Sequence, residues 1–314
     1  MSKFQRSWQL FKSSLVVMQR DKKLLLFPIL TTAITMFIAV LFIVPVAFRP
    51  TGYGYASAEH WKAVGNSVYD VDWQKHSSAN GASQNLTVKG VKPLALGYFA
   101  LMYFVSMFFA TFFNVAFYQQ ILNALSGQPV SIRGGLQFAA TKWKIILMWT
   151  LFAGLVGFII KTLEERSGLV GQWILKLLGT AWSIACVFVI PIIITEQETT
   201  NPLVVLKKSA LTLKKTWGES LIGYVGVSLG GSLIFFGSIL LLGGGIALSV
   251  FLHSWWLAAL VVLGWLAGIF ILSYLMSVAS QIFRCALFLY AANGILPEPY
   301  NEEMMALAWK VRKS

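Results

Sequence analysis

The stretch Ser2–Arg20, SKFQRSWQLFKSSLVVMQR, decides the architecture because it is a basic amphipathic segment that leads directly into a long apolar one. Its apolar residues recur at spacings of 4, 3, 4 and 3: Phe4, Trp8, Phe11, Leu15 and Met18. That spacing is typical of one helix face. Lysines and arginines occupy much of the remaining surface. Because such a helix is too polar to cross lipid, we expect it to lie in the membrane interface.

Two more stretches repeat this design, Ser131–Lys144 and Pro202–Trp217, and each also leads into an apolar span that a second span follows. The middle copy is the weakest, because Gly134 and Gly135 each lower helix propensity by ~1 kcal/mol relative to alanine. Chance similarity among apolar helices is the alternative reading. The repeated order of interfacial helix, outward span, outer connection and returning span favours true repetition.

Composition indicates that lipid is the main solvent. Apolar residues make up 57% of the chain and charged residues 12%, with a mean hydropathy of +0.70; soluble domains are about 25% charged. A hydrocarbon core about 30 Å thick needs ~20 residues of apolar helix. Six segments are expected to span it: Leu24–Phe48, Leu94–Leu125, Ile145–Ile160, Leu169–Thr195, Leu221–Val250 and Trp255–Ala292.

The distribution of charge predicts the orientation. The net charge is +13. Six spans place both termini on one side, where 17 of the 25 lysines and arginines lie, against 7 on the other side. The positive-inside rule therefore puts both termini in the cytoplasm. We expect the basic excess to face anionic lipid rather than nucleic acid.

The predicted fold is all-α: six transmembrane helices in three parallel pseudo-repeats, each preceded by a cytoplasmic interfacial helix. The expected single transmembrane domain covers residues 1–292, with repeats at about 1–125, 126–198 and 199–292. Residues 49–93 form a long outer loop, whose structure the sequence leaves open. Residues 293–314 form a cytoplasmic tail.

No pattern in the sequence indicates catalysis. The three histidines, His60, His76 and His253, lie in outer connections and have no cysteine or carboxylate at metal-ligand spacing. Nucleophile and phosphate-loop motifs are absent from the sequence. We therefore expect a protein that is not an enzyme and has no cofactor. Asp70, Asp72 and His76 fit a solvated loop better than an acid/base site.

A polar stripe marks the sixth span: Ser273, Ser277, Gln281 and Arg284 recur at helical spacing. Asn114 belongs to a similar patch in the second span. These side chains could line a cavity or bind a lipid phosphate; interhelical hydrogen bonding is the alternative, and packing is favoured. The third basic stretch adds four candidate lipid-binding residues: Lys207, Lys208, Lys214 and Lys215.

Three runs carry a resemblance to a known group: Lys161–Gly171, Ala181–Pro191 and Leu206–Glu219. They resemble the signature of a family of uncharacterised bacterial polytopic membrane proteins. More distantly, the layout is similar to the membrane domain of some glycerophosphoryl diester phosphodiesterases, without their hydrolase domain. The resemblance implies fold and compartment and no activity.

The sequence thus favours a non-enzymatic inner-membrane protein that forms a small pore or transport-like cavity, or that serves as a membrane subunit of a larger assembly. The alternative is a scaffold that organises anionic lipid or a protein partner through its basic helices. Expected partners are membrane lipids, with a second copy or a membrane protein as further possibilities. A polar, continuous cavity would favour transport, and a close-packed interior would favour the scaffold.

Overall fold

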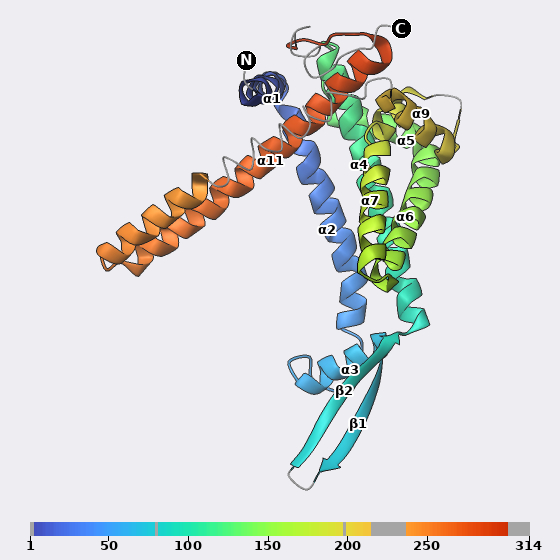
Figure 1. Cartoon of the computed structure of the whole chain (residues 1–314), viewed down its shortest axis with the longest axis vertical. Helices are drawn as coiled ribbons and strands as arrows, with labels where there is room; N and C mark the ends of the chain where they lie inside the picture. The colour runs from blue at the N-terminus through green and yellow to red at the C-terminus, as the bar shows by residue number, and fades with distance from the viewer. Residues whose placement is uncertain (1–2, 79–80, 197–198, 215–236, 301–314) are drawn as a thin grey trace. The chain divides into compact units, whose positions relative to one another are not determined.

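The structure, a computed structural model, describes residues 3–78, 81–196, 199–214 and 237–300 and is mostly helical (Figure 1). The chain divides into two compact units. The first combines Met1–Ile29 with Phe112–Ser314, and the second is Leu30–Thr111. The described elements of the first unit are all helices, as predicted, whereas the second unit also contains two strands, which the all-α prediction did not include.

The elements follow one another as α1 (Lys3–Arg20), the 3-10 helix η1 (Lys22–Leu25), α2 (Leu26–Ala47), α3 (Ala58–Val68), β1 (Tyr69–Ser78), β2 (Gly81–Val91), α4 (Pro93–Leu125), α5 (Ile132–Thr141), α6 (Trp143–Arg166), α7 (Leu169–Ala185), α8 (Val189–Thr195), α9 (Pro202–Lys214), an apolar helix Gly237–Phe251 and α11 (Trp255–Asn293). Helices therefore occupy most of the described residues in all three basic stretches. Their position in the interface stays a prediction.

Five helical segments of the described chain are long and apolar enough to cross a membrane: Lys22–Ala47, Pro93–Leu125, Trp143–Arg166, Val170–Thr195 and Trp255–Asn293. They identify a multi-pass membrane protein. The expected fifth span, Leu221–Val250, falls partly on residues 215–236, outside the described residues. Its second half corresponds to the helix Gly237–Phe251, which is shorter than a span.

In the first unit, α5 packs closely against α4. Phe27 at the start of α2 stacks on Phe117 of α4 with ring centroids 5.5 Å apart. A Cβ at Gly135 would lie 3.0 Å from the Ala116 carbonyl oxygen and 3.2 Å from the Phe27 ring. Glycine here thus permits a close approach, which offsets its low helix propensity. The buried Gln120 side chain accepts from the Ser131 N–H at 2.7 Å and anchors the start of α5.

The fourth span is interrupted, which differs from the continuous helix expected over Leu169–Thr195. Helix α7 ends at Ala185 and α8 begins at Val189. Pro191 lies in the first turn of α8, where a missing N–H is tolerated. In a continuous helix its ring would clash with the carbonyl of Val187. The proline therefore accounts for the break one turn before it.

The expected C-terminal tail begins with a segment that packs onto α1. The Tyr300 ring is buried, and its hydroxyl lies 2.8 Å from the hydroxyl of the buried Ser14. Burial raises the pKa of Tyr300, and the hydrogen bond to Ser14 opposes that rise. Helix α1 also contacts α11. The rest of the tail, residues 301–314, lies outside the described residues.

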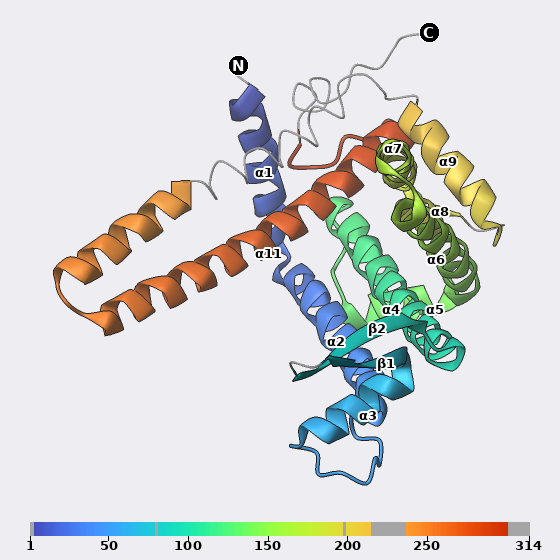
Figure 2. The same ribbon diagram turned by 60° about the horizontal axis from the view of Figure 1, so that its bottom comes forward.

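The helix Gly237–Phe251 and the first half of α11 form an antiparallel hairpin (Figure 2). The Trp265 indole donates to both the carbonyl and the hydroxyl oxygen of Ser238, at 3.1 and 3.2 Å. Gly245 faces Val261 so closely that a Cβ would lie 2.7 Å from that side chain. Gly245 thus permits close packing, as small residues do between membrane helices, whereas an added Cβ at Gly237, Gly243 or Gly244 would meet nothing within 4 Å.

The second unit contains the loop at residues 49–93, which the structure builds from α3 and an antiparallel β1–β2 hairpin. The register pairs Tyr69 with Val91 and Ser78 with Gly81, with an irregularity after Asp70. Ser57 caps α3 by accepting from the His60 N–H at 3.2 Å. The loop therefore contains a helix and a pair of strands; residues 79–80 lie outside the described residues.

Candidate functional site

Helix α9 brings three of the four candidate lysines to one end of the first unit. The Asn201 side chain caps it by accepting from the Leu203 N–H at 3.0 Å, and Pro202 is its first residue. Lys207, Lys208 and Lys214 are exposed. Lys215 lies outside the described residues.

One face of α9 packs against the rest of the first unit. Val205 and Ser209 are fully buried, whereas Leu203 is 57% exposed. Helix α9 contacts α6, α7, α8 and α11. Leu203 is thus exposed on the surface of α9, while the small polar residue Ser209 lies in the buried contact.

Ser209 is buried where its hydroxyl supplies hydrogen-bond partners to backbone groups at the break in the fourth span. Its hydroxyl donates to the Ala185 carbonyl at 2.6 Å and accepts from the Phe188 N–H at 3.1 Å. Both backbone groups lie where the helical ladder is interrupted, and buried backbone groups need partners. One hydroxyl therefore joins α9 to both sides of the break.

An ion pair lies beside this break. Lys208 Nζ contacts the Glu196 carboxylate, and Lys142 Nζ donates to the Glu196 backbone carbonyl. Burial lowers the pKa of Lys142, and the negative charge of Glu196 opposes that shift. The Glu196 side chain is 13% exposed and the Lys208 side chain 50%. Glu196 is therefore held between two lysines from different elements.

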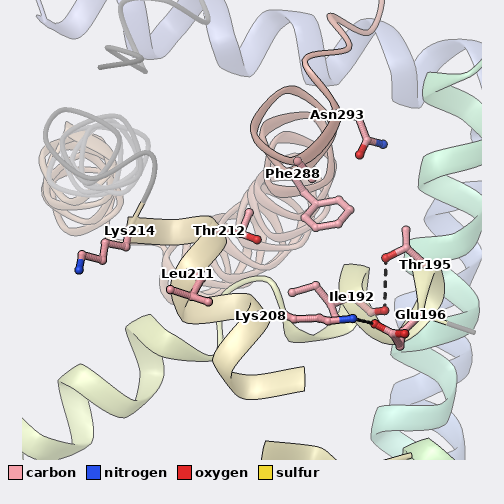
Figure 3. Close-up of a pocket in the computed structure, with 10 residues that line it drawn as sticks. Ile192, Thr195, Glu196, Lys208, Leu211, Thr212, Lys214, Phe288 and Asn293 are labelled. Carbon is pink, nitrogen blue, oxygen red and sulfur yellow. Dashed lines mark hydrogen bonds and ion pairs between the residues drawn. The ribbon is translucent and has the colours of Figure 1, made fainter. Parts of the chain in front are cut away.

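These residues border a cavity of about 670 Å³ among α8, α9 and α11 (Figure 3). The residues that line it are Ile192, Thr195, Glu196, Lys208, Leu211, Thr212, Lys214, Phe288, Ala292 and Asn293. Figure 3 shows the Lys208 side chain reaching Glu196 and the Phe288 ring on the neighbouring helix. The lining joins aliphatic and aromatic surface to two lysines and one carboxylate. Such a cavity suits an amphiphile with a charged head.

The predicted polar stripe of α11 does not gather at this cavity. Ser273 and Ser277 are exposed, and Gln281 and Arg284 are half-buried. Arg284 Nη1 donates to the Tyr118 hydroxyl of α4 at 3.2 Å. Asn114, one turn before Tyr118, is half-buried. The structure thus gives Arg284 the interhelical hydrogen bond that the packing alternative predicted.

Of the ten residues that line the cavity, the sequence nominated only Lys208 and Lys214. The residues that it missed include Glu196, Phe288 and Asn293. Glu196 gave a usable signal, because it is an acidic residue that ends the fourth span on the side where basic residues prevail. Phe288 and Asn293 gave none. For metal binding, the residues that the structure describes contain no group of three or more His, Cys, Asp or Glu side chains that could hold an ion.

Residues 94–296 match the model of a family described as "Family of unknown function (DUF6159)". The chain belongs to this family. No curated protein and no solved structure matches the chain. The expected membership of an uncharacterised family is therefore confirmed, whereas these comparisons give no support for the distant likeness to glycerophosphoryl diester phosphodiesterases. The matched region contains every residue that lines the cavity.

Replacing Arg284 by leucine is expected to lower thermal stability modestly. The variant removes the donor to Tyr118, and hydrogen bonds between membrane helices contribute about 0.6 kcal/mol on average. A functional anion site would instead show lost lipid binding with unchanged or higher stability. Thermal unfolding in detergent, read with lipid content, separates the two. Tyr118→Phe is the matched control, because it removes the same hydrogen bond without removing a charge.

Proposed function

We propose that this protein is a non-enzymatic scaffold of the bacterial inner membrane, with cytoplasmic termini, that organises anionic lipid through its basic helices. The observation that carries the proposal is the cavity at the ends of α8 and α11, where Lys208 and Lys214 of α9 lie beside apolar side chains. Each lysine near an anionic surface contributes about 1 kcal/mol to binding. Exposed leucines on the same helix would enter the lipid.

The proposal includes three parallel repeats, and a recurring contact supports them. Arg20 ends α1 and donates to the Ala124 carbonyl near the end of α4. Lys142 follows α5 and donates to the Glu196 carbonyl at the end of α8. Cations at helix C-termini are favourable, because the carbonyl ends carry partial negative charge. In the third repeat, Lys214 of α9 and Asn293 of α11 line the cavity instead.

We prefer this role to the pore or transport-like cavity that the sequence placed first. Ser273 and Ser277 are exposed on α11 and do not line the cavity. The cavity itself lies at the ends of α8 and α11, beside Thr195 and Asn293, rather than along their length.

The test replaces Lys207, Lys208, Lys214 and Lys215 by glutamine. We expect the anionic lipid that copurifies to fall several-fold, because each lysine contributes about 1 kcal/mol near an anionic surface. The melting temperature should change little, since exposed ion pairs are weak. The measurements are lipid mass spectrometry and thermal unfolding of the purified protein.

A charge-matched control replaces four basic residues expected on the outer side: Arg49, Lys62, Lys161 and Arg166. It should leave the anionic lipid content unchanged. An equal loss in both variants would show that net charge, rather than the basic helices, retains the lipid.

A further inference from the structure

The cavity among α8, α9 and α11 has a charged part and an apolar part, each supplied by different residues. Lys208, Lys214 and Glu196 supply the charges, and Leu211 of α9 and Phe288 of α11 supply apolar surface. Its volume of about 670 Å³ falls within the range of ~300–1,000 Å³ that small-ligand sites show. A ligand that fills it must therefore combine a charged group with a hydrocarbon portion.

The cavity's position within the fold indicates which amphiphile fits. It is bordered by the last residues of two apolar helices that are candidates for crossing the membrane, α8 as the end of Val170–Thr195 and α11. The ends of spans lie at the depth of lipid headgroups. A phospholipid places its phosphate at that depth and its acyl chains toward the hydrocarbon core. The two lysines match the charge of the phosphate.

Glu196 would compete with that phosphate for Lys208. Its carboxylate pairs with Lys208, whose side chain is half exposed and can turn toward a ligand. Glu196 itself is only 13% exposed, and Lys142 holds its backbone carbonyl. The carboxylate would therefore stay in place when Lys208 leaves it, with the positive charge of Lys142 still nearby.

We propose that this cavity is a specific site for one anionic phospholipid, whose phosphate replaces Glu196 as the partner of Lys208 while Leu211 and Phe288 contact its hydrocarbon. The inference rests on the proposed lipid-organising function but is narrower, because it assigns one site with an internal competitor rather than a basic surface.

The experiment titrates phosphatidylglycerol into the purified full-length chain in neutral detergent and counts bound lipids by native mass spectrometry. Lys208→Gln should weaken binding about fivefold, the factor that ~1 kcal/mol per lysine corresponds to. Glu196→Gln should tighten binding by a similar factor, because it removes the competitor and leaves the backbone contact with Lys142. Opposite effects on lipid binding from these two substitutions, made at the two partners of one ion pair, are the result that supports the site.

Two matched controls test whether the site is local. Lys207→Gln removes the same charge from the neighbouring residue, which is exposed and does not line the cavity, and should change binding less than twofold. Leu211→Ser should weaken binding, whereas Leu203→Ser, at an exposed leucine of the same helix outside the cavity, should not. Melting temperatures verify that each variant is folded.

The possible outcomes separate the cavity site from the broader lipid-organising function. Equal losses from Lys207→Gln and Lys208→Gln would overturn the cavity site and leave the basic-surface function standing. Unchanged binding in these variants and in the fourfold lysine variant would overturn both. Inorganic phosphate that binds as tightly as the lipid, with no effect of Leu211→Ser, would show a phosphate site and overturn the lipid assignment. Phosphatidylcholine, which lacks net charge, should bind more weakly than phosphatidylglycerol.

Discussion

Replacing Ser209 by alanine is expected to lower the free energy of unfolding by about 2–4 kcal/mol. The Ser209 hydroxyl is the buried partner of both the Ala185 carbonyl and the Phe188 N–H, on opposite sides of the break between α7 and α8. Each buried polar group that loses its partner costs about 1–3 kcal/mol. Alanine keeps the packing and removes only these bonds. Thermal and denaturant unfolding in detergent measure the loss.

Ser183→Ala is the matched control for this prediction. The Ser183 hydroxyl, on the exposed surface of α7, donates to the Gly179 carbonyl one turn earlier, which already belongs to a helix. Exposed substitutions of this kind change stability by less than about 0.5 kcal/mol. Equal effects at the two serines would mean that the break has other sources of stability and that Ser209 is not its cap.

Hydropathy predicted the long uninterrupted helices closely. The second span was expected at Leu94–Leu125 and is found at Pro93–Leu125; the sixth was expected at Trp255–Ala292 and ends at Asn293. Gly294, at φ +66, ends the latter in the left-handed conformation that glycine adopts freely. Boundaries of this kind depend on local composition, so one sequence suffices to find them.

The cause of the interruption in the fourth span, Pro191, could be read from the local sequence. Whether this proline kinks the helix or breaks it could not. A proline within an apolar run either kinks the helix or breaks it. Which of these occurs depends on whether another element can satisfy the freed backbone groups, and here Ser209 of α9 does so. That partner is 18 residues away from Pro191, so the local pattern could not identify it.

The outer loop and the cavity differ in how far the sequence could predict them. Residues Tyr69–Trp73 alternate apolar and acidic side chains, a period-2 pattern typical of a strand, although the sequence prediction left the structure of this loop open. The cavity had no comparable signal, because Glu196, Lys208 and Phe288 come from three elements whose packing no periodicity specifies. Basic residues could be nominated from the sequence, but the pairing of Glu196 with Lys208 required the tertiary structure.

Replacing His60 by asparagine is expected to destabilise the outer segment of the chain by about 2–4 kcal/mol. The His60 ring is fully buried and packs against Tyr55 with ring centroids 5.0 Å apart. Its Nε2 donates to the Ala47 carbonyl at 2.9 Å, and its Nδ1 lies 2.7 Å from the Thr51 hydroxyl. The shorter amide cannot reach both partners and leaves a cavity. Hydrogen exchange over residues 47–68 should become faster.

His253→Asn makes the same chemical change in an exposed turn and is the matched control. His253 has a φ of +51, and asparagine tolerates that left-handed backbone better than most residues do. Its ring contact to the Phe251 carbonyl is exposed. We therefore expect hydrogen exchange and the melting temperature to stay unchanged in this variant. If His60→Asn behaved in the same way, the end of α2 and the start of α3 would have to be joined by packing alone, without the histidine as their link.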